Sequence, residues 1–274
     1  MLEQLTVVIP TYQNYDLLYQ CLQTLTHYAP GDYKILVVDN DDTEEGQQRV
    51  DRVAGKIDHD VEVHHTGQNT RVMGAFNAAL SRCETNFMAL YHDDNIMEPG
   101  NSEFWDGMLV IASYPSVGMV GPAVTNCTGL QHMERWDLPD IISVPYLNGA
   151  CLVFRTEAMR NIGGLSEDIS PCDDVELAIR TKALGYELIA DRRRCVYHKR
   201  HTPYKRTRRP EKEAYLLELM FNKIVQRHGV RATCETFMSI PDWEFALMTC
   251  PAWGDLVGRM SARYPAWEVD LEYA

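Results

Sequence analysis

Long apolar runs and paired cysteines are both missing from this chain. None of its 274 residues lie in a run approaching the roughly 20 apolar residues of a membrane span, so we expect no transmembrane helix. The first residues, MLEQLTVVIP, lack the basic region and apolar core of a signal peptide. The eight cysteines are scattered without a CxxC pair, which favours free thiols over a disulfide framework. These absences predict a cytoplasmic protein.

A glycine-rich GxGxxG motif is also missing after the first apolar run, LTVVIP. That motif is the defining feature of Rossmann-type oxidoreductases, so its absence excludes this class. The composition, 45% hydrophobic and 24% charged, is ordinary for a globular protein.

Positive charge is scarce except in one segment. The net charge of −13 argues against a protein that coats nucleic acid. The segment 192–209, here called the basic segment, contains nine Lys or Arg residues and no acid, which leaves −13 − 9 = −22 for the rest of the chain. We expect this segment, read as a loop, to bind an anion. Its cations are Arg192, Arg193, Arg194, Lys199, Arg200, Lys205, Arg206, Arg208 and Arg209.

Strands and helices alternate in the first ninety residues. Short apolar or alternating runs predict strands over 5–10, 33–38, 61–65 and 86–91, and periodic stripes predict helices over 16–27, 44–57 and 71–83. Asp16 is the expected N-cap of the first helix. This rhythm is typical of βαβ units and therefore of an α/β protein with a mainly parallel sheet.

Polar clusters follow three of these strands, at 11–14, 39–42 and 93–95. In parallel sheets, ligands bind beyond the carboxyl ends of the strands. We therefore expect the three clusters to form one site. Within it, the adjacent Asp93 and Asp94 in LYHDDNIMEPG are explained either by a solvated turn or by a divalent cation, since Mg²⁺ favours carboxylate oxygens.

The second half of the sequence is less regular. Strands are expected over 117–120, 151–154 and 186–190, with helices over 157–161, 173–183 and 211–228. The helix at 173 begins with Asp173 and Asp174, whose charges would in any case be favourable beside a helix N-terminus.

Six motifs together resemble family 2 glycosyltransferases over roughly the first 200 residues. They are VVIPTYQN at 7–14, ILVVDNDD at 35–42, Asn69 with GAFNAAL at 74–80, LYHDDNIMEPG at 90–100, NGACLVFRTEAMRNIGGLSED at 148–168 and DDVELAIR at 173–180. The resemblance implies a GT-A fold, with a Rossmann-like, mixed, mainly parallel sheet flanked by helices. It also implies a core over 1–205, divided into a nucleotide-binding half (1–100) and an acceptor half (101–205), and a C-terminal helical extension over 206–274.

The resemblance further implies transfer of a sugar from a nucleotide diphosphate, usually with inversion and with Mn²⁺ or Mg²⁺; a UDP-sugar is the family-weighted donor. The residues that it places around the nucleotide are Pro10, Thr11 and Tyr12 beside the base, Asp39 as an acceptor for the base with Asn40 and Asp41 nearby, and Asn69, Gly74 and Asn77 along the ribose and phosphates.

The same resemblance assigns the chemistry to two acidic pairs. Asp94 is the expected metal ligand, and Asp93 is expected at the ribose or just outside the metal's ligands. Asp174 is the expected base that deprotonates the acceptor hydroxyl, with Asp173 as the alternate. Asn148 and Gly149 would line the acceptor side.

A histidine that completes the metal site is expected in CVYHKRH, at His198 or at the nearby His201. Lys199 and Arg200 would close over the diphosphate as part of a lid.

The acceptor is left open by the sequence, although the basic segment indicates an anionic one. A hydroxymethylated DNA base and a lipid-linked or membrane-surface glycan both fit, the second with peripheral membrane contact. A soluble saccharide also fits. A non-catalytic protein that binds a sugar nucleotide is the alternative from another class, and the oligomeric state is open.

Overall fold

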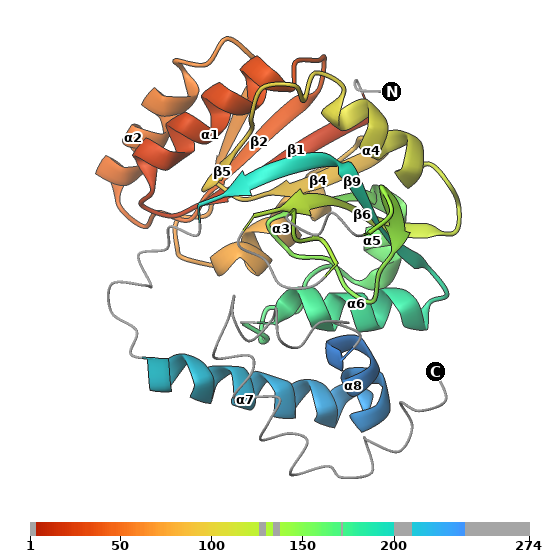
Figure 1. Ribbon diagram of the computed structural model, residues 1–274. Helices are drawn as coiled ribbons and strands as arrows, with labels where there is room; N and C mark the ends of the chain where they lie inside the picture. The colour runs from red at the N-terminus through yellow and green to blue at the C-terminus, as the bar shows by residue number, and fades with distance from the viewer. Residues whose placement is uncertain (1–3, 126–129, 134–137, 171, 200–209, 239–274) are drawn as a thin grey trace.

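The structure is a computed structural model that describes residues 4–125, 130–133, 138–170, 172–199 and 210–238 (Figure 1). Strands and helices alternate in the first half: β1 (Leu5–Thr11), α1 (Tyr15–Tyr28), β2 (Lys34–Asp39), α2 (Glu44–Ala54), β3 (Val61–His65), α3 (Arg71–Arg82) and β4 (Phe87–Tyr91). The elements that follow are β5 (Asn95–Ile96), α4 (Phe104–Ala112), β6 (Val117–Val124), β7 (Ile141–Ser143), β8 (Cys151–Arg155), α5 (Thr156–Ile162), α6 (Asp173–Ala183), β9 (Glu187–His198), α7 (Pro210–His228) and α8 (Val230–Met238).

One mixed sheet organises these elements in the order β3-β2-β1-β4-β8-β6-β9-β5, and β7 pairs with β9. β1 is parallel to both β2 and β4, and β2 is parallel to β3. β8 runs antiparallel between β4 and β6, whereas β6 and β9 are parallel. The predicted α/β class, a mixed and mostly parallel sheet flanked by helices, is confirmed. Because β1, β2 and β4 are parallel, their carboxyl ends meet at one edge.

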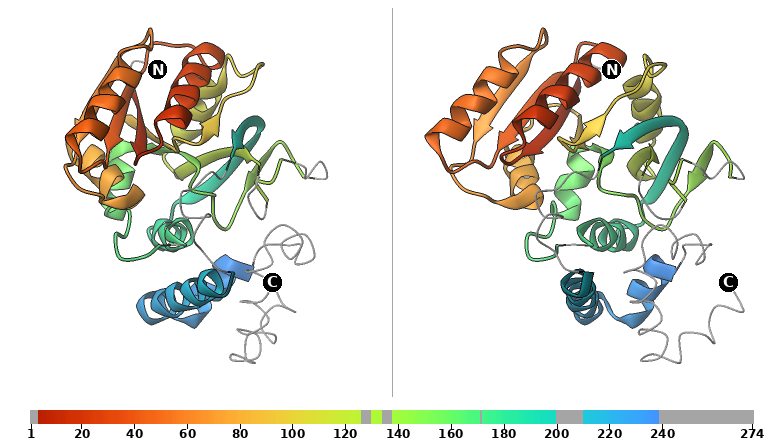
Figure 2. Two further views of the ribbon diagram at one scale, coloured as in Figure 1. Left: turned by 90° about the vertical axis from the view of Figure 1, so that its left-hand side faces the viewer. Right: turned by 60° about the vertical axis from the view of Figure 1, so that its left-hand side comes forward.

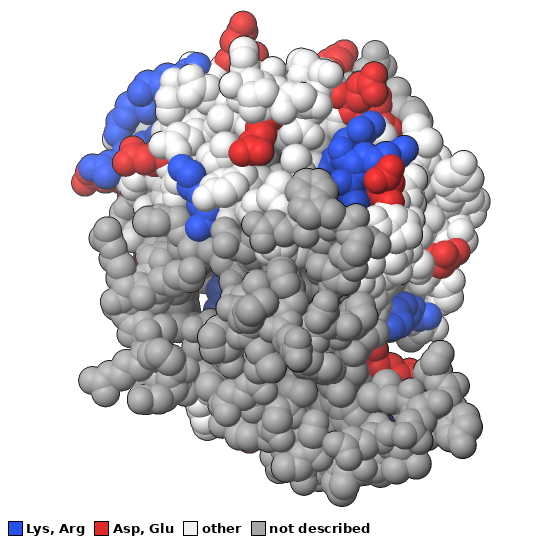
Figure 3. Space-filling model, viewed as in Figure 1, with Lys and Arg blue, Asp and Glu red and all other residues white. Residues whose placement is uncertain are grey.

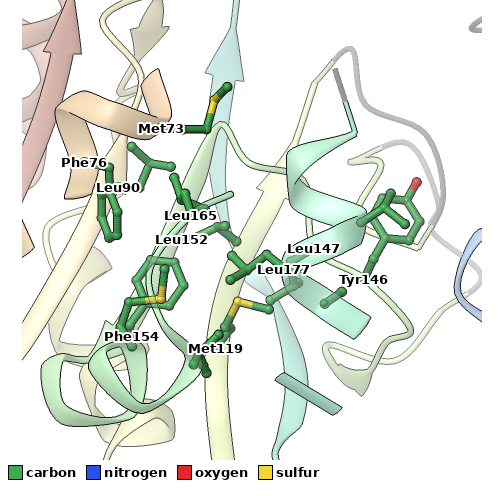
Figure 4. Packing of buried hydrophobic residues seen from close by; sticks show 14 of the residues in the cluster. Met73, Phe76, Leu90, Met119, Tyr146, Leu147, Leu152, Phe154, Leu165 and Leu177 are labelled. Atoms are coloured by element: carbon green, nitrogen blue, oxygen red, sulfur yellow. The ribbon is translucent and has the colours of Figure 1, made fainter. Parts of the chain in front are cut away.

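Two hydrophobic cores lie on opposite faces of the sheet. Alternate residues of a strand point to opposite faces, so Val7 and Ile9 pack with α1, α2 and α4, whereas Val8 packs with α3, α5 and α6. Figure 2 shows these helices on the two sides of the sheet. Figure 4 shows part of the second core, in which Phe76 of α3 and Leu177 of α6 converge with strand residues. Burial on both faces explains why the parallel strands are continuously apolar.

The predicted apolar stripe of α1 is confirmed, because Leu17, Leu18, Cys21, Leu22 and Leu25 are buried. The predicted N-cap is wrong. The helix begins at Tyr15 after Asn14, so Asp16 lies inside the first turn, where its charge interacts favourably with the helix dipole.

Several elements after β4 differ from the prediction, and β5, β7 and α8 were not expected. Two further differences have a clear physical reason. Helix α4 was not predicted, because FWDGMLVIA is apolar on most sides and so gives no amphipathic stripe; six of its nine residues are buried. The strand expected over 186–190 continues as β9 to His198, through the first part of the basic segment. Arg193 pairs with Asp191 at 2.8 Å, and Arg192 donates to the carbonyls of Leu130 and His132, which lets these cations lie within a strand.

The predicted C-terminal extension begins with α7 and α8, and residues 239–274 lie outside the described part of the chain. Met220, Phe221 and Ile224 of α7 join the core that contains α6, and both helices lie beside α6 in Figures 1 and 2. Strands from both predicted halves form one sheet, and the domain division itself stays a prediction. In the described part of the chain, no helix combines the length and apolar character needed to cross a membrane.

A buried carboxylate connects α6 to α7. Glu176 has no exposed surface, and its oxygens lie 2.8 Å from Arg180 Nη2, 2.9 Å from His228 Nε2 and 2.8 Å from Ser166 Oγ. Burial acts to raise the pKa of Glu176, but the hydrogen bonds and charge of Arg180 outweigh burial and lower it. The C-terminal helix is thereby attached to the helix that begins with Asp173 and Asp174.

Replacing this carboxylate should destabilise the fold strongly. Glu176→Gln leaves Arg180 without its buried counter-charge, so we expect the free energy of unfolding to fall by about 3 kcal/mol in urea titrations. Glu235→Gln is the matched control, since Glu235 pairs with Arg231 at 2.7 Å at an exposed position, and it should change stability by less than about 0.5 kcal/mol. Equal effects of the two substitutions would contradict this role.

Candidate functional site

Polar residues from three strand ends meet at the carboxyl edge of the sheet, as predicted. Thr11, the last residue of β1, donates its hydroxyl to Asp93 Oδ2 after β4 at 2.7 Å. The backbone N–H of Asn40, after β2, donates to the carbonyl of Thr11 at 2.9 Å. Pro10 and Thr11 are buried, whereas Tyr12 is partly exposed. The three segments therefore form one cluster.

Asp39, the predicted acceptor for the base, is fully buried at this edge. Its Oδ1 accepts from the backbone N–H of Asp41 at 3.0 Å, and its Oδ2 lies 2.8 Å from His65 Nδ1. His65 Nε2 lies 3.1 Å from Asp51 of α2. Burial raises the pKa of Asp39, and the hydrogen bonds from Asp41 and His65 act against this rise. His65 therefore orients the carboxylate, a contact that the sequence motifs did not indicate.

The side chain of Asp41 is committed to donors within the chain. Its Oδ1 accepts from the Thr43 hydroxyl at 2.7 Å, and its Oδ2 accepts from the Tyr15 hydroxyl at 2.6 Å. Burial acts to raise the pKa of Asp41, but these donors outweigh it and lower the pKa. A Cβ on Gly46 would overlap the carboxylate, so a glycine is needed there. Asp41 lies near the site as predicted and anchors the turn that follows β2.

Asn40 organises the start of α3. Its Oδ1 accepts from the Thr70 hydroxyl at 2.7 Å, and its Nδ2 donates to the carbonyl of Arg71 at 3.1 Å. A Cβ on Gly74 would lie 2.6 Å from Thr70 Cβ, so the predicted phosphate-side glycine also allows Thr70 to pack here. Asn69 is exposed and accepts from the backbone N–H of Arg71 at 2.9 Å.

Asn77 does not join this cluster. Its amide donates to the Leu165 carbonyl and to Glu167 Oε1, each at 2.9 Å, and accepts from the backbone N–H of Leu165 at 2.8 Å. These bonds attach α3 to the turn after α5, so the structure gives Asn77 a structural role.

A candidate metal centre lies next to the Thr11–Asp93 contact. One ligand atom from each of His92, Asp94 and His198 lies within 4.8 Å of the other two. Asp94 Oδ1 is 3.2 Å from His198 Nε2, and the rings of His92 and His198 are 5.7 Å apart at their centroids. Two imidazoles and a carboxylate are donors that divalent transition metals accept, so these residues fit such an ion. The competing His201 lies outside the described residues.

Burial shifts the pKa of His92, which belongs to this centre, and of Asp93, which adjoins it, and both shifts favour the neutral form. It lowers the pKa of His92 to about 4, while the nearby charge of Asp94 acts to raise it. Burial likewise raises the pKa of Asp93 to about 7, although the Thr11 hydroxyl acts to lower it. At neutral pH His92 is therefore the neutral imidazole that can bind a metal.

The predicted base is connected to this centre through the segment 148–150. Asp174 Oδ2 accepts from the backbone N–H of Gly149 at 3.4 Å. The next residue, Ala150, accepts at its carbonyl from the backbone N–H of His92 at 3.0 Å. Asn148 Oδ1 accepts from the backbone N–H of Ala150 at 3.0 Å and so shapes the same turn. The predicted acceptor-side residues thus lie between the acidic pair of α6 and the metal centre.

The pKa of Asp173, the first residue of α6, is well above its ordinary value. Burial and then the charge of Asp174 raise the pKa of Asp173 to about 7. Two carboxyl groups that share one site in this way hold a proton near neutral pH, which is the range in which a general base works.

Left-handed backbone conformations mark three points of this region. Within the described residues, the non-glycine residues with positive φ are Gln13 (53°), Arg71 (61°) and Cys172 (78°). They follow β1, begin α3 and precede Asp173, respectively. Such conformations cost about 1–3 kcal/mol each and cluster at functional sites.

The described part of the basic segment does not present a free cationic surface. Arg192 and Arg193 are used within the fold, Arg194 lies 3.9 Å from Glu103, and Lys199 donates to Gln20 at 2.7 Å. In Figure 3 blue side chains lie at several separate places on the visible face, some of them beside red ones. Arg200 and residues 201–209 lie outside the described residues.

Two functional candidates were missed by the sequence motifs. His92 stands one residue before the predicted acidic pair, and its place at the end of β4 could have indicated a ligand. His65 ends β3, and only the parallel register that places it opposite Asp39 shows their contact.

Comparisons with known proteins identify the kind of domain. Residues 6–103 match the family model described as Glycosyl transferase family 2, which confirms the resemblance seen in the motifs. A pre-mycofactocin glycosyltransferase of Mycobacterium tuberculosis is 26% identical over 159 residues, covering 52% of this chain and 33% of the relative. The chain therefore spans about a third of the length of the curated relatives that it matches.

Solved structures confirm the GT-A fold. The mannosyltransferase PcManGT from Pyrobaculum calidifontis, in complex with GDP-Man and Mn²⁺, has a TM-score of 0.66 at 17% identity, covering 97% of this chain and 82% of that one. S. aureus TarS 1–349 with UDP-GlcNAc has a TM-score of 0.60 at 15% identity, covering 93% and 80%. GalNAc-T7 with UDP, GalNAc and Mn²⁺ has a TM-score of 0.60 at 12% identity, covering 71% and 43%. At these identities the likenesses show the fold.

Asp173 and Asp168 should affect the pH dependence of the free energy of unfolding in opposite directions. The pKa of Asp173 is raised to about 7, so the folded state holds its proton more tightly, and stability should fall as pH rises from about 4 to 7. Asp173→Asn should remove this loss of stability. Because solvent reaches the carboxyl group and screens its charge, we expect a gain of about 2 kcal/mol at pH 8, half of what the full pKa shift would give.

Asp168 provides the control. Hydrogen bonds from Lys223 and Arg227 lower its pKa to about 2, so its stabilisation is present above pH 4 and lost as pH falls toward 2. Asp168→Asn should therefore destabilise the chain at neutral pH, whereas Asp173→Asn should stabilise it. Urea titrations at pH 5 and 8 measure both, and a loss of stability in Asp173→Asn at pH 8 would contradict the assignment.

Proposed function

We propose that this chain transfers a sugar from a nucleotide diphosphate donor to an acceptor hydroxyl, with inversion, at the carboxyl edge of its sheet. One observation carries the proposal: His92, Asp94 and His198 converge to within 4.8 Å beside the Thr11–Asp93 contact. A metal centre beside a cluster of strand ends is the arrangement that binds a diphosphate next to a nucleoside.

The nucleoside would lie over the ends of β1 and β2. Asp39 offers a buried carboxylate, oriented by His65, to an N–H of the base, and the 10–12 segment borders it. Asp93, held by Thr11, would contact the ribose. A UDP-sugar is the donor favoured by the resemblance. The GDP-Man and UDP-GlcNAc in the similar structures make both nucleotides worth testing.

Mn²⁺ or Mg²⁺ held by Asp94, His198 and His92 would neutralise charge on the departing diphosphate. His92 and His198 can each bind such an ion through a ring nitrogen, and Asp94 through its carboxylate. Lys199 and Arg200 are the proposed diphosphate lid. Lys199 Nζ donates a hydrogen bond to Gln20 Oε1 at 2.7 Å, and this bond would have to break before Lys199 could reach the diphosphate.

Asp174 would accept the proton of the acceptor hydroxyl as that oxygen attacks the anomeric carbon and the diphosphate leaves. The 148–150 turn lies between Asp174 and His92. An acceptor bound against this turn would reach both the Asp174 carboxylate and the sugar donor. Asp173 is the alternate base, and its raised pKa means that the pair retains a proton near pH 7.

The acceptor class stays a prediction. Three of the nine cations in the basic segment, Arg192 to Arg194, are used within or beside the fold, and five lie outside the described residues. This reduces the charge on which a nucleic-acid or lipid-linked acceptor was predicted. The acceptors to assay are therefore hydroxymethylated DNA, lipid-linked glycans and soluble saccharides.

Two substitutions separate binding from chemistry. UDP or GDP with Mn²⁺ at about 100 times its Kd should raise the Tm of the unmodified chain by about 5 °C or more. Asp174→Asn should keep this shift but lose at least about 100-fold in donor hydrolysis or transfer, because the base is gone. Asp94→Ala should lose the metal-dependent shift itself.

Asp106→Asn, at an exposed position of α4, is the matched control and should change neither the Tm shift nor the turnover of the donor. Donor turnover in Asp174→Asn within threefold of the unmodified chain would refute its role as the base. A Tm shift without any turnover in the unmodified chain would instead favour a non-catalytic sugar-nucleotide-binding protein.

A further inference from the structure

We propose that His92, Asp94 and His198 bind a divalent ion before any nucleotide is present, and that they select ions that favour imidazole, such as Co²⁺ and Zn²⁺, over Mg²⁺. The inference deepens the proposed function, since it concerns the same site. It differs from a site in which the ion is held mainly between one carboxylate and the diphosphate of the donor.

The spacing of the three side chains carries the first step. Their ligand atoms lie within 4.8 Å of one another, and Asp94 Oδ1 is 3.2 Å from His198 Nε2. Ligands that bind one ion at about 2.1 Å lie about 3.4 Å apart in tetrahedral geometry, and up to about 4.2 Å apart on opposite sides of the ion. Side-chain shifts of about 1 Å therefore bring all three atoms into the range of a single ion.

Backbone hydrogen bonds within the chain fix the main chain at all three residues, without a nucleotide. Asn95 pairs with His198 where β5 meets β9, and the backbone N–H of Lys199 donates to the carbonyl of Asp94 at 3.0 Å. The backbone N–H of His198 donates to the Thr125 hydroxyl at 2.8 Å. His92 is fixed from the other side by its bond to Ala150. A site assembled in this way needs little reorganisation to bind an ion.

The donor set decides which ion is preferred. Two imidazole nitrogens and one carboxylate oxygen suit Co²⁺ and Zn²⁺, and Mn²⁺ less strongly, in the usual affinity order for such ligands. Mg²⁺ favours oxygen ligands and gives up its waters reluctantly, so two imidazoles gain it little. Three protein ligands also leave coordination positions open, which the oxygens of a donor can fill.

His92 is the residue that separates this proposal from a carboxylate site. Asp94 alone, with oxygens from a nucleotide, would bind Mg²⁺ and Co²⁺ with similar affinity and would bind neither tightly without the nucleotide. The second imidazole adds nucleotide-independent affinity for ions that accept nitrogen. Removing His92 should therefore weaken Co²⁺ binding and leave Mg²⁺ binding almost unchanged.

Isothermal titration of the full chain with Co²⁺ and with Mg²⁺, in the absence of nucleotide, tests this directly. We expect one Co²⁺ per chain, bound at least about 100-fold more tightly than Mg²⁺. His92→Asn should weaken Co²⁺ binding about tenfold or more and change Mg²⁺ binding less than about threefold. His27→Asn, at an exposed position of α1 outside the cluster, should leave Co²⁺ binding unchanged. Thermal melts of each variant confirm that it is folded.

The proposal would be overturned by an unmodified chain that binds Co²⁺ only when UDP or GDP is present. Equal losses in His92→Asn and His27→Asn would overturn it as well. These outcomes leave the glycosyltransferase proposal intact, because nucleotide binding is titrated separately. Conversely, Co²⁺ bound without nucleotide by a chain that binds no nucleotide would support the metal inference and contradict the proposed function.

Discussion

The parallel pairing of β1 with β2 and β4 is the constraint on which the rest of the structure depends. It brings the carboxylates that follow these strands to one edge, where Asp39 has no exposed surface and Asp94 is 4% exposed. Buried like charges are costly unless donors or a cation offset them. Hydrogen bonds from Thr11 and His65 supply part of that compensation, and the metal centre beside Asp94 would supply the rest.

The second half of the chain completes this edge. Antiparallel β8 places the 148–150 turn against His92, and β9 brings His198 to Asp94. Helix α6 then contributes Asp174 beside Gly149, while α7 holds α6 through the buried Glu176. Hydrogen bonds and strand pairing therefore connect α6 and α7 to the edge of the sheet formed by β1, β2 and β4. This connection brings residues more than 70 positions apart in the sequence to one edge of the sheet.

Much of this arrangement could be predicted from sequence. Period and composition located β1 to β4 and α1 to α3, because each strand is apolar on both faces and each helix has a clear stripe. Contacts between segments could not be predicted: Asp39 with His65 depends on register, and His198 with Asp94 depends on β9 continuing through arginines. Asn77 followed the family pattern, yet its hydrogen bonds attach α3 to a turn. Only three-dimensional neighbours distinguish these roles.

The most direct measurement of the central claim is the position of Mn²⁺ in crystals grown with UDP or GDP, located by its anomalous scattering. We expect one peak about 2.2 Å from a carboxylate oxygen of Asp94, with the diphosphate on its open side and the base over the ends of β1 and β2 near Asp39. A nucleotide bound elsewhere, or a peak remote from Asp94 and His198, would show that the strand-end cluster is not the donor site.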